Sequence, residues 1–147
     1  MNENKSLQGL VNALKCLPGV GPKSALRLAY YLLQRNRKGA DNLSQAISNA
    51  LESLGHCKLC NNFTELDVCS ICDSSKRDQE TLCIVEMPTD LLMMEQTHSY
   101  KGMYFVLMGR LSPLDGIGPK EIHLDRLINR IKKSDIREII LATNFTA

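Results

Sequence analysis

Four cysteines within a short polar segment are the residues of this sequence best able to do chemistry. Cys57 and Cys60 form one Cys-x-x-Cys pair, and Cys69 and Cys72 form a second, with eight residues between the pairs. A two-residue gap lets both sulfurs of a pair reach one ion, and two pairs supply the four corners of a tetrahedron. Thiolates in this arrangement favour zinc, with iron as the lesser alternative. Because protein ligands fill every position, we expect a structural metal site.

Two other interpretations of the cysteines are weaker. A redox Cys-x-x-Cys motif needs one pair at a helix start, not two pairs in a polar loop, and four unconnected thiols would not show this spacing. His56 adjoins the first pair, and we expect it to be a neighbour of the site and not a ligand. Cys16 and Cys83 stand in apolar surroundings and are predicted to lie in the core.

A glycine–proline bend is the second candidate site. The segment 17–23 reads Leu-Pro-Gly-Val-Gly-Pro-Lys and is followed by an amphipathic helix. The simplest interpretation is a tight turn between helices. The alternative is a helix–hairpin–helix, in which Gly19 and Gly21 let backbone N–H groups approach a DNA phosphate at the helix N-terminus. Lys23 and Arg27 lie four residues apart on the outer face beside the bend, and for this reason we favour DNA binding, independent of base sequence and sensitive to salt.

The same Gly-x-Gly-Pro-Lys pattern recurs at residues 116–120, where the surrounding charge is balanced and no helix precedes it. We interpret this copy as a turn and a helix start, with DNA contact as the minor alternative.

Acidic residues after a buried strand are the third candidate. Glu86 follows the apolar run 82–85, and Asp90 lies one helical turn beyond it. Carboxylates at strand ends bind Mg²⁺ together with substrate phosphates. A catalytic centre of this kind needs a second acidic pair at another strand end, and neither 108–110 nor 142–144 supplies one. The sequence also contains no phosphate-binding GxxxxGK loop, so it does not support catalysis.

Periodicity predicts the elements that carry these residues. Apolar residues at helical spacing predict three helices in the first third of the chain, the third ended by Gly55, and two helices later on. Apolar runs predict three strands, and alternation of strands with helices predicts a parallel sheet. The predicted strands cover 82–85, 103–108 and 139–142. The predicted helices cover 7–14, 22–33, 43–54, a segment that opens within 86–90 and runs to about 96, and 124–131.

Composition and charge narrow the function classes. The chain has 147 residues, of which 44% are hydrophobic and 23% charged, as in an ordinary globular protein. The polar start 1–5 leads into no long apolar stretch, and the longest apolar run, 103–108, is far shorter than a bilayer span, so we expect a cytosolic protein.

Net charge is +4 over residues 1–55 and −1 over each of 56–79 and 80–147. We therefore expect affinity for phosphate in the first region. The scarcity of aromatic residues argues against binding of stacked bases.

Three motifs together resemble the RecR family of bacterial recombination proteins. They are the bend and helix start at 17–25, the four cysteines, and the segment 109–119, which reads Gly-Arg-Leu-Ser-Pro-Leu-Asp-Gly-Ile-Gly-Pro. The resemblance implies a multi-module α/β protein: a helix–hairpin–helix over 1–55, a C4 zinc finger over 56–79, and a Toprim-like partial parallel α/β sheet over 80–147. Glu86 matches the first acidic Toprim position, as a vestige without catalytic function, and Lys23 and Arg27 match the DNA-binding positions of the family.

The resemblance also implies partners. It predicts a cytoplasmic, nucleoid-associated mediator of recombinational repair that acts with RecO and RecF to load recombinase on single-stranded DNA, as a dimer or tetrameric ring. The family has a proline where this chain has Phe145 and continues with further elements, so the sequence predicts a C-terminally shortened Toprim domain. Two alternatives stay open: a Mg²⁺-dependent Toprim nuclease or primase subunit that uses Glu86, and a scaffold that binds only proteins.

Overall fold

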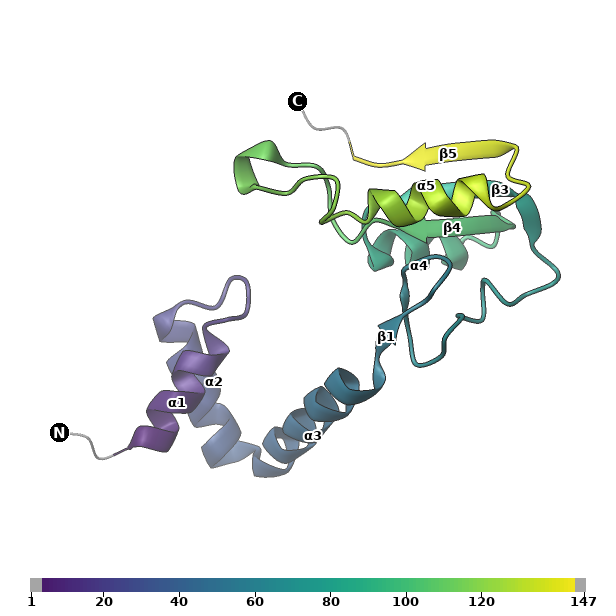
Figure 1. Ribbon diagram of the computed structural model, residues 1–147. Coiled ribbons are helices and arrows are strands. Elements are labelled where there is room, and N and C mark those ends of the chain that lie inside the picture. The colour runs from purple at the N-terminus through teal and green to yellow at the C-terminus, as the bar shows by residue number, and fades with distance from the viewer. Residues whose placement is uncertain (1–3, 145–147) are drawn as a thin grey trace. The chain divides into compact units, whose positions relative to one another are not determined.

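The computed structural model describes residues 4–144 and divides the chain into two compact units, Met1–Glu52 and Ser53–Ala147 (Figure 1). The departure from the family at Phe145 lies outside the described residues. The finer boundaries that the sequence predicts, at residues 55 and 79, stay a prediction. Among the described residues, no helix has the length and apolar character needed to cross a membrane.

From residue 4 onward, the first unit is built from three helices, α1 (Lys5–Leu14), α2 (Pro22–Arg35) and α3 (Arg37–Ser53), the last of which ends at the boundary with the second unit. The predicted apolar face of α1 packs on α2, and the buried residues are Val11, Ala25 and Ala29. Alanine side chains at two successive turns of α2 let the helices approach closely, while Leu7, Leu10, Leu14 and Val20 surround this small core.

The apolar stripe of α3 does not form a core. None of its residues is buried, and Ile47 and Leu51 are 53% and 79% exposed. The helix stops at Ser53, one residue before the predicted end, and Gly55 then pairs with Thr64 in a short antiparallel ladder. Cys16 is exposed, contrary to prediction, whereas Cys83 is buried. Helical periodicity identifies the apolar face of α3. It does not show whether another part of the chain covers that face.

The second unit contains a two-stranded ladder and a three-stranded parallel sheet of order β4-β3-β5. Its elements are β1 (Gly55–His56), β2 (Phe63–Thr64), β3 (Asp78–Val85), α4 (Pro88–Gln96), β4 (Gly102–Val106), η1 (Pro113–Asp115), α5 (Leu124–Lys132) and β5 (Glu138–Ala142). The parallel sheet, its three strands and both helices confirm the sequence prediction. The second glycine repeat is a turn, as predicted, although α5 begins only at Leu124.

Alternate residues of β3 face two different layers. Leu82 and Ile84 belong to the cluster that contains Leu127 of α5 and all four site cysteines. Cys83 and Val85 belong to the cluster that contains Leu91 of α4. Helices thus cover both faces of the sheet, which explains why the run 82–85 is apolar without alternation.

Candidate metal centre and nucleic-acid interface

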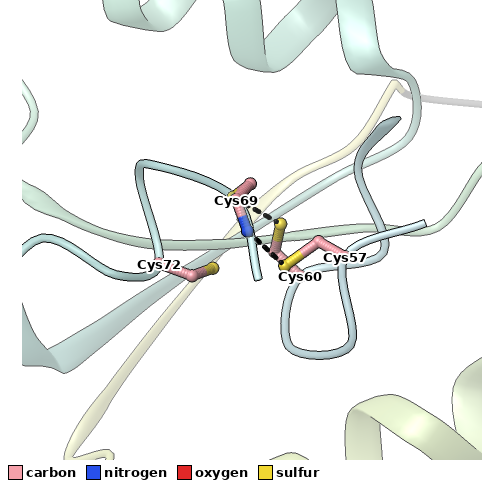
Figure 2. A group of neighbouring side chains, drawn as sticks. All are labelled: Cys57, Cys60, Cys69 and Cys72. Carbon is pink, nitrogen blue, oxygen red and sulfur yellow. Dashed lines mark hydrogen bonds between the residues drawn. The ribbon is translucent and has the colours of Figure 1, made fainter. Parts of the chain in front are cut away.

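The four predicted ligands meet at one point. The sulfur atoms of Cys57, Cys60, Cys69 and Cys72 all lie within 4.8 Å of one another, and all four residues are buried (Figure 2). Zinc–sulfur bonds of about 2.3 Å place tetrahedral sulfurs about 3.8 Å apart, and the Sγ atoms of Cys60 and Cys69 are 3.5 Å apart. The donor set and its spacing fit Zn²⁺, which would be held by four thiolates and serve a structural role.

Local backbone hydrogen bonds form the two turns that aim the sulfurs. In the first turn, Asn61 adopts a left-handed conformation with φ of 64°, and its N–H donates to the carbonyl of Cys57 at 3.0 Å. In the second, the N–H of Asp73 donates to the carbonyl of Cys69 at 3.0 Å. The N–H of Cys69 also donates to Sγ of Cys57 at 3.3 Å, which joins the two turns. Asparagine tolerates the left-handed region better than most residues.

The thiols influence one another strongly because they are close and buried. The contact with Cys69 raises the pKa of Cys60 to about 12, with burial acting in the same direction. The hydrogen bonds from Cys60 and Cys72 lower the pKa of Cys69. One thiolate stabilised by protonated neighbours is the result expected without a cation, and a divalent ion allows all four thiols to ionise.

Side-chain and backbone hydrogen bonds attach the first cysteine turn (residues 57–61, the first metal turn) to the sheet. The amide nitrogen of Asn61 donates to the carbonyl of Val106 at 2.9 Å, and the N–H of Val106 donates to the carbonyl of Cys60 at 2.8 Å. Nη1 of Arg126 donates to the amide oxygen of Asn61 at 2.6 Å. His56 lies outside the sulfur cluster, and its Nδ1 is 3.0 Å from the carbonyl oxygen of Asn61. Hydrogen bonds therefore join the metal centre directly to β4 of the sheet.

The glycine–proline bend begins with a tight turn. The N–H of Val20 donates to the carbonyl of Leu17 at 3.1 Å, and Gly19 has φ of 77°. Proline at the second position and a positive φ at the third are typical of a type II turn, which favours glycine there. Gly19 and Gly21 are exposed, and a Cβ atom at either position would meet nothing within 4 Å. The bend thus presents its backbone to solvent.

The start of α2 offers unpaired donors beside two cations. Among the described residues, the N–H groups of Lys23 and Ser24 donate to no protein acceptor, and no side chain caps the helix. Lys23 and Arg27 are both exposed, as predicted, and neither forms an ion pair in the described part of the chain. Free N–H groups at a helix N-terminus attract anions. This geometry is compatible with a phosphate contact.

Glu86 is buried at the carboxyl end of β3 and meets the end of β5. Its two carboxylate oxygens accept hydrogen bonds of 3.1 Å from the backbone N–H and the side-chain amide of Asn144. A pocket of about 180 Å³ opens beside them and is also lined by Arg110. Asp90 does not join this pocket, because its carboxylate accepts the N–H of Met87 at the start of α4. Within the described residues, the cysteine cluster is the only group of three or more potential metal ligands.

Sequence reasoning missed the residues that connect the predicted ones. Asn61, Arg126 and Asn144 each link segments that are far apart in the chain. A polar residue directly after the first cysteine pair was an available signal for Asn61. Arg126 and Arg130, four residues apart on the polar face of α5, were another signal.

Known family models match the chain in three successive segments. Residues 7–51 match the model described as RecR, helix-hairpin-helix. Residues 54–74 match that of the RecR four-cysteine zinc finger domain, and residues 80–147 match that of the Toprim domain. The order agrees with the three parts predicted from the sequence, and the zinc-finger match covers all four cysteines.

Proposed function

Because the chain belongs to the RecR family, whose domains indicate a DNA-binding role in recombinational repair, we propose that it is a non-enzymatic mediator that contacts the DNA backbone through its first unit. The contact comprises the backbone at Gly19 and Gly21 and the side chains of Lys23 and Arg27. The observation that carries this proposal is the exposed bend, which leads into a helix start with unpaired N–H groups. In this proposal the zinc centre stabilises the fold and takes no part in a reaction.

The surroundings of Glu86 support the non-enzymatic part of the proposal. A Mg²⁺ site that transfers phosphoryl groups needs acidic ligands that remain free for the ion. Both oxygens of Glu86 are already engaged by Asn144, and the other charged residue in the pocket lining is Arg110. A cation beside the carboxylate disfavours binding of a second cation. Magnesium-dependent turnover of DNA that is lost in Glu86→Gln would favour the nuclease or primase alternative instead.

The repair partners follow from the family. We propose that the protein acts with RecO and RecF to load recombinase on single-stranded DNA, in the cytoplasm and at the nucleoid. We also propose that the exposed apolar face of α3 packs against another copy of the chain, because Ile47 and Leu51 remain 53% and 79% exposed within the described residues. Light scattering tests this: Ile47→Lys is expected to lower the molar mass of the assembly, and Lys38→Gln on the same helix is the control.

Salt titration of DNA binding tests the main proposal. The double variant Lys23→Ala with Arg27→Ala should weaken binding to all sequences and flatten the slope of log K against log salt by about 1.4 for single strands. The matched control, Arg37→Ala with Lys38→Ala, removes the same charge from the start of α3 and should lose much less affinity. Equal losses in the two variants would mean that the first unit attracts DNA only through its net charge.

A further inference from the structure

A basic cleft lies between the first metal turn and α5, within the second unit. Its volume is about 330 Å³, and four of its lining residues are cations: Lys58, Arg126, Arg130 and Lys133. Among the described residues, no carboxylate lines it. Neither the metal centre nor the predicted DNA contact uses this cleft.

Most of the positive charge in the cleft is uncompensated. Lys58 forms an ion pair with Asp67 at 2.6 Å, but both side chains are largely exposed. Within residues 4–144, Arg126, Arg130 and Lys133 have no carboxylate oxygen within 4.0 Å of their nitrogens. Three cations around one cleft repel one another unless an anion lies between them.

The protein holds both guanidinium groups in place. Arg126 donates from Nη2 to the carbonyl of Cys57 at 3.1 Å, in addition to its bond with the Asn61 side chain. Arg130 donates from Nη1 to the carbonyls of Leu59 and Tyr104 at 2.8 and 2.6 Å. These bonds attach α5 to the first metal turn. They hold the guanidinium groups of Arg126 and Arg130 in the same cleft although the two charges repel each other.

Some guanidinium donors remain available. In the described part of the chain, Nε of Arg126 and both Nε and Nη2 of Arg130 donate to no protein acceptor. The adjacent Nε and Nη2 groups of an arginine form the fork that binds two oxygens of one phosphate. Lys133 adds a third charge, on a long side chain at the end of α5.

We propose that this cleft binds a phosphate group, held by the fork of Arg130, by Nε of Arg126 and by the ammonium of Lys133. A phosphate matches the cleft better than a carboxylate because it offers more oxygens and up to two negative charges to three cations. The group is either a phosphodiester of a nucleic acid or a small phosphate compound. The proposal does not depend on DNA binding by the first unit.

Nuclear magnetic resonance on the full zinc-loaded chain tests the proposal. Titration with inorganic phosphate at constant ionic strength should shift the backbone amides of Lys58 and Leu59, those of residues 130–134, and the Nε–H signals of the two arginines. Lys133→Gln should weaken this response several-fold while leaving both held arginines intact. Lys132→Gln changes the same charge on the neighbouring residue, which does not line the cleft, and should retain it.

A second titration identifies the source of the phosphate. A single-stranded oligodeoxynucleotide is added to the variant Lys23→Ala with Arg27→Ala. Shifts of the cleft signals would assign the site to nucleic acid, whereas shifts with inorganic phosphate alone would assign it to a small phosphate compound. Absence of shifts with both probes, or equal weakening by Lys132→Gln and Lys133→Gln, would overturn the proposal. The signals of residues 19–27 report the first unit separately, so failure of one site is distinguishable from failure of the other.

Discussion

The side-chain amide of Asn61, the last residue of the first metal turn, donates to the backbone carbonyl of Val106, the last residue of β4, at 2.9 Å. Asn61 has no exposed surface, and its amide oxygen accepts from Arg126. One side chain thus joins the metal turn, the sheet and α5. This contact connects the two parts of the second unit that the sequence predicts as separate domains.

Replacement of Asn61 should therefore destabilise the second unit. Asn61→Ala leaves the carbonyl of Val106 without this donor, removes an acceptor from Arg126 and puts alanine at positive φ, so we expect a loss of about 2–4 kcal/mol in the free energy of unfolding. Urea titration of the zinc-loaded protein measures it. Asn62→Ala is the matched control, because no side-chain hydrogen bond of Asn62 is observed among the described residues. Equal stability of the two variants would contradict the connecting role.

Metal binding should depend on the thiolates and on pH. Cys60→Ser is expected to abolish retention of zinc after gel filtration, and Cys16→Ser, which changes an exposed cysteine, should retain one zinc ion per chain. Protons compete with the ion for sulfur, so affinity falls as pH falls. The raised pKa of Cys60, about 12 without metal, adds to the cost of ionising it. Elemental analysis measures the metal and distinguishes zinc from iron. A Cys60→Ser protein with unchanged zinc affinity would refute the four-thiolate centre.

Two glycines of the first unit should respond to alanine with opposite signs. Gly19 has φ of 77° in the bend, so Gly19→Ala should destabilise the local structure by about 1 kcal/mol. Gly9 lies inside α1 with open space around its Cβ position, so Gly9→Ala should stabilise by about 0.5–1 kcal/mol. Amide hydrogen exchange in α1 and α2 reports both changes. Faster exchange in both variants would show that the space around position 9 of α1 is too small for a methyl group.

An ion pair between Arg77 and Glu95 should make stability depend on pH. Arg77 donates two hydrogen bonds to the carboxylate of Glu95, at 3.0 and 2.8 Å, and Tyr104 donates a third at 2.6 Å. Burial by itself raises the pKa of Glu95, but these bonds outweigh it and hold the pKa below the ordinary value of 4.5. The stabilisation is therefore present above about pH 4.5 and is lost as pH falls through the lower folded value.

Glu95→Gln is the variant that removes this dependence. It should lower the free energy of unfolding by about 1–3 kcal/mol at pH 7 and flatten the decline of that free energy below about pH 4.5. The control is Glu138→Gln, which changes an exposed carboxylate on β5. A Glu95→Gln protein whose acid limb matches that of the unchanged protein would show that other carboxylates dominate.

Several parts of this protein were predictable because they follow from local chemistry. The spacing of Cys57, Cys60, Cys69 and Cys72 predicts one four-sulfur site, since each pair needs only a tight turn to converge. Pro18 followed by Gly19 predicts the turn before α2, and the apolar run 82–85 predicts a strand buried on both faces. Each of these features depends on residues close together in the chain.

Other features depend on which distant segments meet, and the sequence alone did not determine them. The apolar stripe of α3 has helical periodicity, yet only the fold shows that none of the described residues of its own unit buries it. The hydrogen bonds of Asn61 with Val106 and of Glu86 with Asn144 join residues that the chain separates widely. The basic cleft exists because α5 lies against the metal turn. Residue type and spacing determined the donors, while tertiary packing decided which acceptors and charges they face.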